Sequence, residues 1–104
     1  MPILSFTVNC PDAETAADIA DDLLVRRLVA CADILPPVES HYRWEDEIEY
    51  GEEIPLVLKT RPDLEAPVEA AIQQLHPYDT PQILRHAETA NGDFKAWVIA
   101  QTTP

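Results

Sequence analysis

The stretch that decides the fold runs over residues 31–60 and reads CADILPPVESHYRWEDEIEYGEEIPLVLKT. It holds two β-prone runs, 31–44 and 48–60, joined by the acidic turn 45–47. At about 3.3 Å per residue, a strand of about twelve residues spans about 40 Å, which is longer than a helix of about eighteen residues. The sequence therefore predicts a hairpin whose far end stands beyond any layer of helices packed on the sheet.

Proline marks both strands of this hairpin. Pro36 and Pro37 divide the first strand into 31–35 and 38–44. Pro55 lies inside the second strand, where its ring nitrogen has no hydrogen to donate to a neighbouring strand. We therefore expect a bulge or an unpaired donor position at Pro55.

Outward from the hairpin, hydrophobic periodicity predicts the other elements. They are a strand at 3–8, a helix at 12–29 capped by Asp12, a helix at 64–75 ended by His76-Pro77, a strand at 82–88, and a last helix capped by Asn91 with Phe94, Trp97 and Val98 facing inward. For the helix at 64–75, either the first turn is irregular or Ala66 is the cap and Pro67 the first residue. The order predicts one α+β domain over residues 1–104. This domain is a ferredoxin-like βαββαβ sandwich with an extended hairpin between its second and third predicted strands and an extra C-terminal helix.

The net charge of the chain limits the classes of partner that it can bind. Nineteen acidic residues against seven basic ones give a formal net charge of -12, so we expect binding of neither nucleic acid nor an anionic membrane surface. Such a chain attracts cations. No apolar run approaches the ~20 residues of a membrane span, and residues 1–10 do not resemble a signal peptide, so we expect a cytoplasmic protein. The topology separates Cys10 from Cys31, so no intrachain disulfide is expected.

The far end of the hairpin carries large apolar side chains, namely those of Tyr42, Trp44, Ile48 and Tyr50. Leaving them in water wastes apolar surface and exposes open strand edges. We expect other subunits to cover the hairpin and the bare sheet face in a closed ring. The alternative is a mobile loop with a few exposed aromatic residues.

Five blocks in register over nearly the whole chain resemble the CutA divalent-cation tolerance family. They are LVACADILP at 28–36, SHYRWEDEI at 40–48, Lys59-Thr60, HPYDTPQI at 76–83, and the pair Phe94 and Trp97. The resemblance implies a ferredoxin-like fold, a cytoplasmic homotrimer, and a response to divalent metal ions, usually copper, without catalysis or a required cofactor. The trimer is also similar to PII signalling proteins, which suggests a small-molecule sensor with inter-subunit clefts as the alternative. Asp46 stands where the family pattern has Gly, so that turn must be built differently.

Two sets of residues are candidates for a site. Possible ligands for a metal such as Cu²⁺ are His76, Cys10 and Cys31, of which Cys10 is expected to be exposed beside a turn. The alternatives are a helix-capping imidazole at His76 and a buried thiol at Cys31. Tyr42, Trp44, Lys59 and Tyr78 are expected to line a cleft between subunits that suits a small anion, or to pack in the interface. His41 and His86 are taken as structural or surface residues, and no catalytic motif is present.

Overall fold

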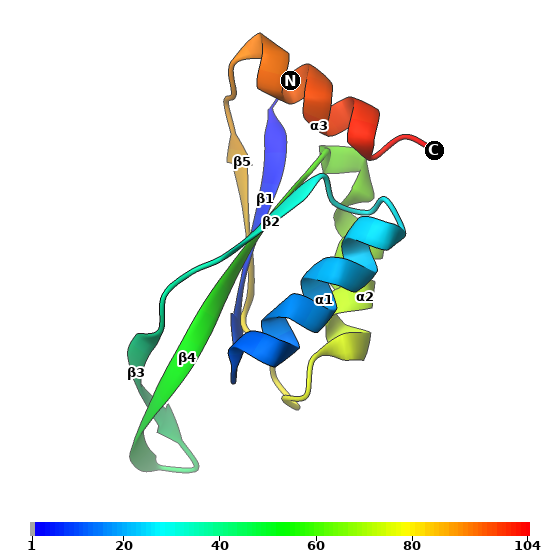
Figure 1. The fold of residues 1–104 in the computed structure, drawn as a ribbon. Coiled ribbons are helices and arrows are strands. Elements are labelled where there is room, and N and C mark those ends of the chain that lie inside the picture. Colours follow the sequence, from blue (N-terminus) through cyan, green and yellow to red (C-terminus); the bar gives the residue numbers. More distant parts are fainter. Residues whose placement is uncertain (1) are drawn as a thin grey trace.

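A computed structural model describes residues 2–104 as one α+β sandwich (Figure 1). The elements are β1 (Ile3–Cys10), α1 (Ala13–Val25), β2 (Cys31–Ile34), β3 (Val38–Trp44), β4 (Glu47–Thr60), a 3₁₀ turn (Pro62–Leu64), α2 (Glu65–Leu75), β5 (Ile83–Glu88) and α3 (Gly92–Gln101). The strands pair antiparallel in the order β2-β4-β1-β5, and β3 pairs with β4 alone. The predicted ferredoxin-like βαββαβ order with an added C-terminal helix is confirmed.

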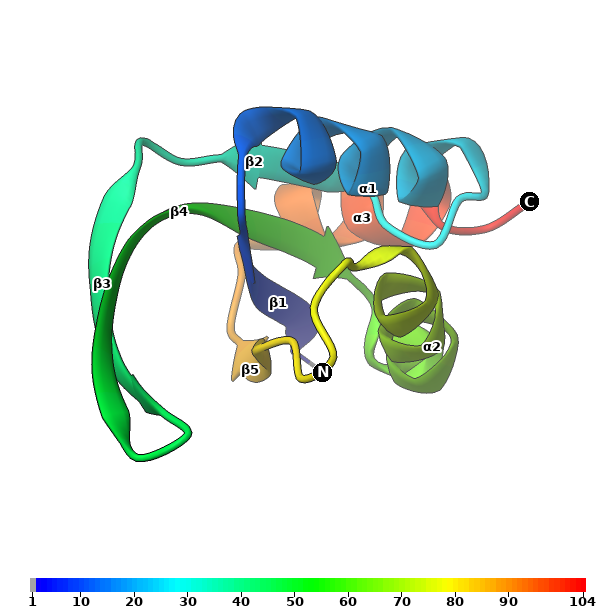
Figure 2. The ribbon, with the colours of Figure 1, turned by 90° about the horizontal axis from the view of Figure 1, so that it is seen from below.

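Helices α1 and α2 cover one face of the sheet (Figures 1 and 2). Alternate residues of β1 point into this layer, so that Phe6 and Val8 are fully buried beside Leu23 of α1 and Ile72 of α2. A smaller cluster forms where α3 packs on Ile3. Among residues 2–104, no helix is both long enough and apolar enough to cross a membrane.

Helix α3 corrects one prediction. Val98 is fully buried and Phe94 packs on the small cluster, as predicted. Trp97, however, is 43% exposed and stacks on Phe94 with 5.8 Å between ring centroids. Ile99 of the same helix is exposed as well, so only part of the apolar surface of α3 is covered within one subunit.

Helix α1 begins as predicted but ends earlier than predicted. The Asp12 carboxylate accepts a 2.7 Å hydrogen bond from the Thr15 backbone N–H. The helix ends at Val25 rather than near residue 29, because Arg27 adopts a left-handed conformation with φ of 57°. The Leu28 N–H then bonds to the Leu23 carbonyl at 2.9 Å and the Arg27 N–H to that of Leu24 at 3.1 Å. This pattern is a Schellman motif, which ends a helix without needing proline.

Helix α2 has the irregular start that was one of the two alternatives. A 3₁₀ turn leads into it, Leu64 is its cap, and Pro67 is its third residue rather than its first. Proline costs no hydrogen bond there, because the first-turn N–H groups have no partner within the helix. His76 caps the other end, as the His76-Pro77 pair predicted.

The long hairpin projects away from the helices as an arm, formed by β3 and residues 47–53 of β4 (Figures 1 and 2). At its base, the Leu35 N–H donates to the Pro55 carbonyl at 2.9 Å, so the Pro55 nitrogen faces the same neighbour with nothing to donate. The pairing register then shifts by one, which sets Pro36 and Pro37 against the single residue Ile54. The expected irregularity at Pro55 is therefore present, with the extra residue on the opposite strand.

The arm closes in a two-residue turn. Trp44 pairs with Glu47, and the residues between them, Glu45 and Asp46, have φ of 49° and 66°. Positive φ at both central positions is typical of a type I′ turn, which normally carries glycine. Asp46 therefore adopts, with positive φ, the backbone conformation of a turn position where the family pattern has Gly.

Candidate functional site

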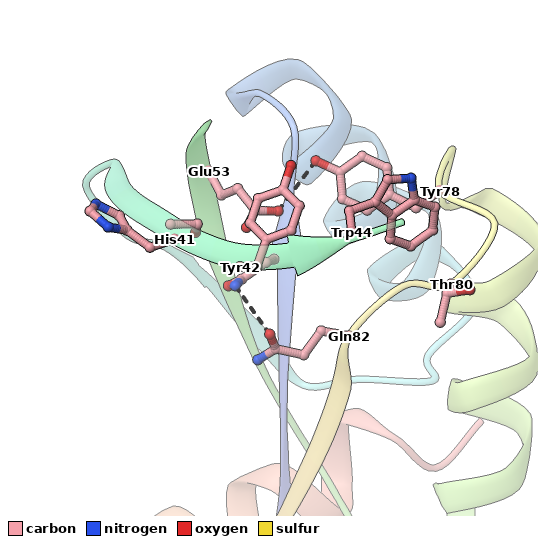
Figure 3. A pocket seen from close by; sticks show the side chains of 9 residues that line it. His41, Tyr42, Trp44, Glu53, Tyr78, Thr80 and Gln82 are labelled. Carbon is pink, nitrogen blue, oxygen red and sulfur yellow. Dashed lines mark hydrogen bonds between the residues drawn. The ribbon is translucent and has the colours of Figure 1, made fainter. Parts of the chain in front are cut away.

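A pocket of about 440 Å³ lies where the arm meets the sheet and the segment that follows α2 (Figure 3). Its lining is aromatic and polar, and consists of Asn9, Ser40, His41, Tyr42, Trp44, Glu53, Tyr78, Thr80 and Gln82. Four parts of the chain contribute to it: the end of β1, the two strands of the arm, β3 and β4, and the segment between α2 and β5. Its size lies in the range of small-molecule sites.

The register of the arm decides which side chains face this pocket. Side chains alternate along β3, so Tyr42 and Trp44 share one face, and directly opposed residues on paired strands share that face too. Glu53 pairs with Val38, which puts its carboxylate on the face of Tyr42. Figure 3 shows the Tyr42 ring near Glu53 and the Tyr78 hydroxyl directed toward Glu53, while the His41 side chain points away.

Tyr78 connects the segment after α2 to the arm. Its hydroxyl donates a 3.2 Å hydrogen bond to Oε2 of Glu53. Burial, followed by the nearby Glu53 carboxylate, raises the pKa of Tyr78 to about 12. The phenol therefore remains a neutral donor at physiological pH.

His76 is only 7% exposed, and both of its ring nitrogens bond within the subunit. Nδ1 accepts from the Tyr78 backbone N–H at 3.1 Å, so the ring proton is on Nε2, which donates to the Asn9 carbonyl at 2.8 Å. The ring also lies against that of Tyr78, with 4.7 Å between centroids. His76 therefore ties the end of α2 to the end of β1 and holds Tyr78 in the pocket wall.

The two cysteines lie apart, and one of them is not where the sequence suggested. Cys10 has an exposed fraction of 0%, so its predicted exposure beside a turn is wrong, because the alternation of β1 directs it into the core. Burial, with Asp12 and Glu53 nearby, raises the pKa of its thiol to about 11. Cys31 is half-buried, and burial raises the pKa of its thiol as well.

The three predicted metal ligands do not meet within one subunit. Cys10 pairs with Ile54 and Cys31 with Lys59, positions separated by on the order of 16 Å along β4. Over residues 2–104, no three His, Cys, Asp or Glu side chains are grouped so that they could hold a metal ion. His76, Cys10 and Cys31 therefore do not fit a shared copper site in a single chain.

Lys59 is separated from the other three residues predicted for the cleft. Its ammonium group donates to Oγ of Ser5 and Oε1 of Glu88, both at 3.1 Å. The hydrogen bonds from Ser5 and Lys59 hold the pKa of the Glu88 carboxyl below its usual value. Lys59 lies ten residues beyond Glu49, the partner of Tyr42, or on the order of 33 Å along β4. One subunit therefore brings together Tyr42, Trp44 and Tyr78 but not Lys59.

Sequence reasoning missed several pocket residues, chiefly Glu53, Asn9 and Gln82. Asn9 and Gln82 are bridged by a 3.3 Å hydrogen bond from Nδ2 to Oε1 (Figure 3). The signal for Glu53 was available, because a two-residue turn at 45–46 fixes which side chains share the face of Tyr42. His41 and His86 are exposed, as expected, and His41 lies edge-on to Tyr50 at 4.7 Å.

The fold and the pocket define a small ferredoxin-like protein with a projecting β-arm and an aromatic, acidic cavity at its base. Residues 4–101 match the profile of the CutA1 divalent ion tolerance protein family, and the chain belongs to that family. The divalent-cation tolerance protein CutA of Pyrococcus horikoshii is 41% identical over 93 residues, which cover 88% of this chain and 90% of that protein.

Solved structures agree with this assignment over almost the whole chain. The crystal structure of the divalent ion tolerance protein CutA1 from Ehrlichia chaffeensis superposes with a TM-score of 0.95 at 38% identity, covering 99% of this chain and 97% of that one. The periplasmic divalent cation tolerance protein CutA from Archaeoglobus fulgidus gives 0.92 at 30% identity, covering 97% and 99%. The long arm is therefore part of a shared fold.

Proposed function

We propose that this chain forms a homotrimer that binds divalent copper in the cytoplasm and contributes to metal tolerance without catalysing a reaction. Membership of the CutA family supports the relation to divalent cations. The net charge of -12 supports it independently, because such a surface concentrates cations. The trimer, copper and the cytoplasm are what the resemblance of the sequence implies.

The observation that carries the assembly is the apolar surface of the arm. Trp44 is 49% exposed on one face of the arm in one subunit, and Tyr50, 65% exposed, lies on the opposite face together with Ile48, which is also exposed. The bare face of the sheet adds Leu35 and Leu84. Contact with further copies buries such surface and covers open strand edges, and a ring does so for every subunit alike.

The distance between the predicted ligands limits where a copper site could form. A tight copper site needs several donors converging at about 2.0–2.3 Å. Because Cys31 lies apart from Cys10 and from His76, whose ring is bonded beside Cys10 at Asn9, a tight site at Cys31 would have to draw donors from more than one subunit. Cys31 is the most accessible of the three, since Cys10 is buried and both nitrogens of His76 are already bonded.

Calorimetry with Cu²⁺ tests this proposal. We expect uptake tighter than millimolar by the assembled protein and a clear loss of affinity in Cys31→Ser. Cys10→Ser is the matched control, because it makes the same change at a buried thiol and should bind copper like the wild type. Uptake no tighter than millimolar, or equal affinity in Cys31→Ser and the wild type, contradicts the copper role at this residue.

The pocket at the base of the arm favours a second candidate function, that of a small-molecule sensor similar to PII proteins. Its volume and its aromatic and polar lining are those of a ligand site. A ligand in contact with both the arm and the segment after α2 would change how the arm is held. Titration with small ligands, with the oligomeric state followed by light scattering, tests this candidate: a ligand that binds and leaves the assembly unchanged counts against a sensor.

A further inference from the structure

The arm is joined to the rest of its subunit through a weak base. Strand β3 pairs with β4 alone, and Pro36 and Pro37 interrupt the pairing between β2 and β3. Proline has no N–H to donate, and a strand pair bends where its register shifts. Without a further contact, the angle between the arm and the sheet would therefore be free to vary.

One side-chain hydrogen bond limits that angle. Glu53 pairs with Val38, so it belongs to the first pair of arm residues beyond the two prolines. Its Oε2 accepts the 3.2 Å bond from the hydroxyl of Tyr78, which lies in the segment after α2 (Figure 3). Across residues 2–104, no other side-chain hydrogen bond or ion pair joins the arm to another element. The Tyr78–Glu53 bond is therefore placed to fix the direction of the arm.

Tyr78 is itself held firmly by the body of the subunit. Nδ1 of His76 accepts from its backbone N–H at 3.1 Å, and Nε2 of His76 donates to the Asn9 carbonyl at 2.8 Å. The rings of His76 and Tyr78 lie 4.7 Å apart between centroids. Pro77 and Pro81 restrict the backbone on either side. The Tyr78 hydroxyl is therefore a fixed point to which the arm is bonded.

The face of the arm that carries Tyr42 and Trp44 continues the bare face of the sheet. Alternate residues of β4 share a face, so Glu49 lies on the same side of the strand as Val57, opposite to the buried Leu56 and Leu58. Tyr42 is directly opposite Glu49 and shares its face. A copy that covers the bare sheet face therefore also meets the aromatic residues on this face of the arm.

We propose that the Tyr78–Glu53 bond sets the angle at which the arm binds a second copy of this chain, with the face of Tyr42 and Trp44 against that copy. The inference rests on the homotrimer proposed above and adds the contact that positions the arm within it. An arm that is already held at the right angle loses less freedom on assembly, so a larger fraction of subunits is ready to associate. Tyr78 and Glu53 are therefore positioning residues for the interface between copies.

Tyr78→Phe tests this role, because it removes only the hydroxyl. Tyr50→Phe is the matched control, since it removes the same group from the opposite face of the arm. The quantity measured is the protomer concentration at which half of the assembly dissociates, followed by fluorescence-detected sedimentation in the presence of a chelator. One hydrogen bond changes an equilibrium by about fivefold. Since three arms act in each trimer, Tyr78→Phe should raise the dissociation constant by about 100-fold and the half-dissociation concentration by about tenfold, while Tyr50→Phe leaves both unchanged.

Glu53→Ala removes the other half of the same bond. Glu52→Ala is its control, because it makes the same change of charge on the opposite face of the arm. Glu53→Ala should weaken assembly about as much as Tyr78→Phe, and the double variant should be no weaker than either single variant. Hydrogen exchange of the amides at 38–53 should be faster in trimeric Tyr78→Phe than in trimeric Tyr50→Phe, with β1 unchanged, because the arm moves while the core stays intact.

The outcomes separate this inference from the trimer on which it rests. A wild-type protein that is a monomer at micromolar concentration contradicts the trimer and the inference together. A trimeric wild type leaves the trimer standing, and the inference is then overturned by any of three results. These are equal half-dissociation concentrations for Tyr78→Phe and Tyr50→Phe, additive effects of the Tyr78 and Glu53 variants, or faster exchange in β1 as well as in the arm.

Discussion

Replacing His76 by alanine should destabilise the protein whether or not metal is present. The substitution leaves the Asn9 carbonyl and the Tyr78 N–H without their partner in a nearly buried setting. Each lost hydrogen bond costs about 1 kcal/mol, and an unsatisfied buried group costs more. With the lost packing of the ring against Tyr78, we expect the free energy of unfolding to fall by about 2–4 kcal/mol.

Urea denaturation followed by circular dichroism measures this change. The protomer concentration must be fixed and a chelator present, because assembly and metal binding both shift apparent stability. His86→Ala is the control: His86 is exposed, and its loss should change stability by no more than about 0.5 kcal/mol. One result would show that the structural role is wrong and that the ring is a metal ligand. In that result, His76→Ala is as stable as His86→Ala when a chelator is present, and it is less stable than the wild type only when copper is bound.

Three further outcomes are expected. Asp46→Gly should raise the free energy of unfolding by about 0.5 kcal/mol, because φ of 66° suits glycine, and an unchanged or lower denaturation midpoint would argue against strain in the turn. Because burial raises the pKa of the Cys10 thiol from 9.0 to about 11, the folded state holds that proton more tightly, so stability should fall as pH rises from 9 to 11. Cys10→Ala should flatten that fall, and an identical pH profile in the variant would exclude the thiol as its source. Thr60→Val should cost about 1–2 kcal/mol, because the buried hydroxyl donates to the Leu28 carbonyl at 2.6 Å, while Thr60→Ser should restore most of the loss; equal losses in both variants would point to packing instead.

Most of the fold could be predicted from sequence because periodicity and proline act locally. The alternation of Leu4, Phe6 and Val8 defines β1 and its buried face, and His76-Pro77 ends α2. The early end of α1 at Val25 could not be predicted from periodicity or from proline. Arg27 adopts a left-handed conformation that glycine usually provides, so the sequence carries no ordinary stop signal there.

The candidate site was predicted less completely because it depends on contacts between distant segments. Tyr42, Trp44 and Tyr78, which the aromatic blocks of the sequence marked, line one pocket of a single subunit, while their place in a cleft between subunits stays a prediction. Lys59 lies far from them in the same subunit, at a distance along β4 that the register of a strand of 14 residues sets, so in the predicted inter-subunit cleft it would have to come from a neighbouring copy. Cys10 was judged by the turn beside it, whereas the inward face of β1 decides its burial.

The central claim is that further copies of the chain cover the exposed aromatic residues of the arm. Sedimentation equilibrium at micromolar protomer concentration tests it most directly. The account predicts a single species with three times the mass of one chain, in which acrylamide quenches Trp44 fluorescence poorly, measured in the Trp97→Phe background. A species with the mass of one chain, and with Trp44 freely quenched, would contradict it.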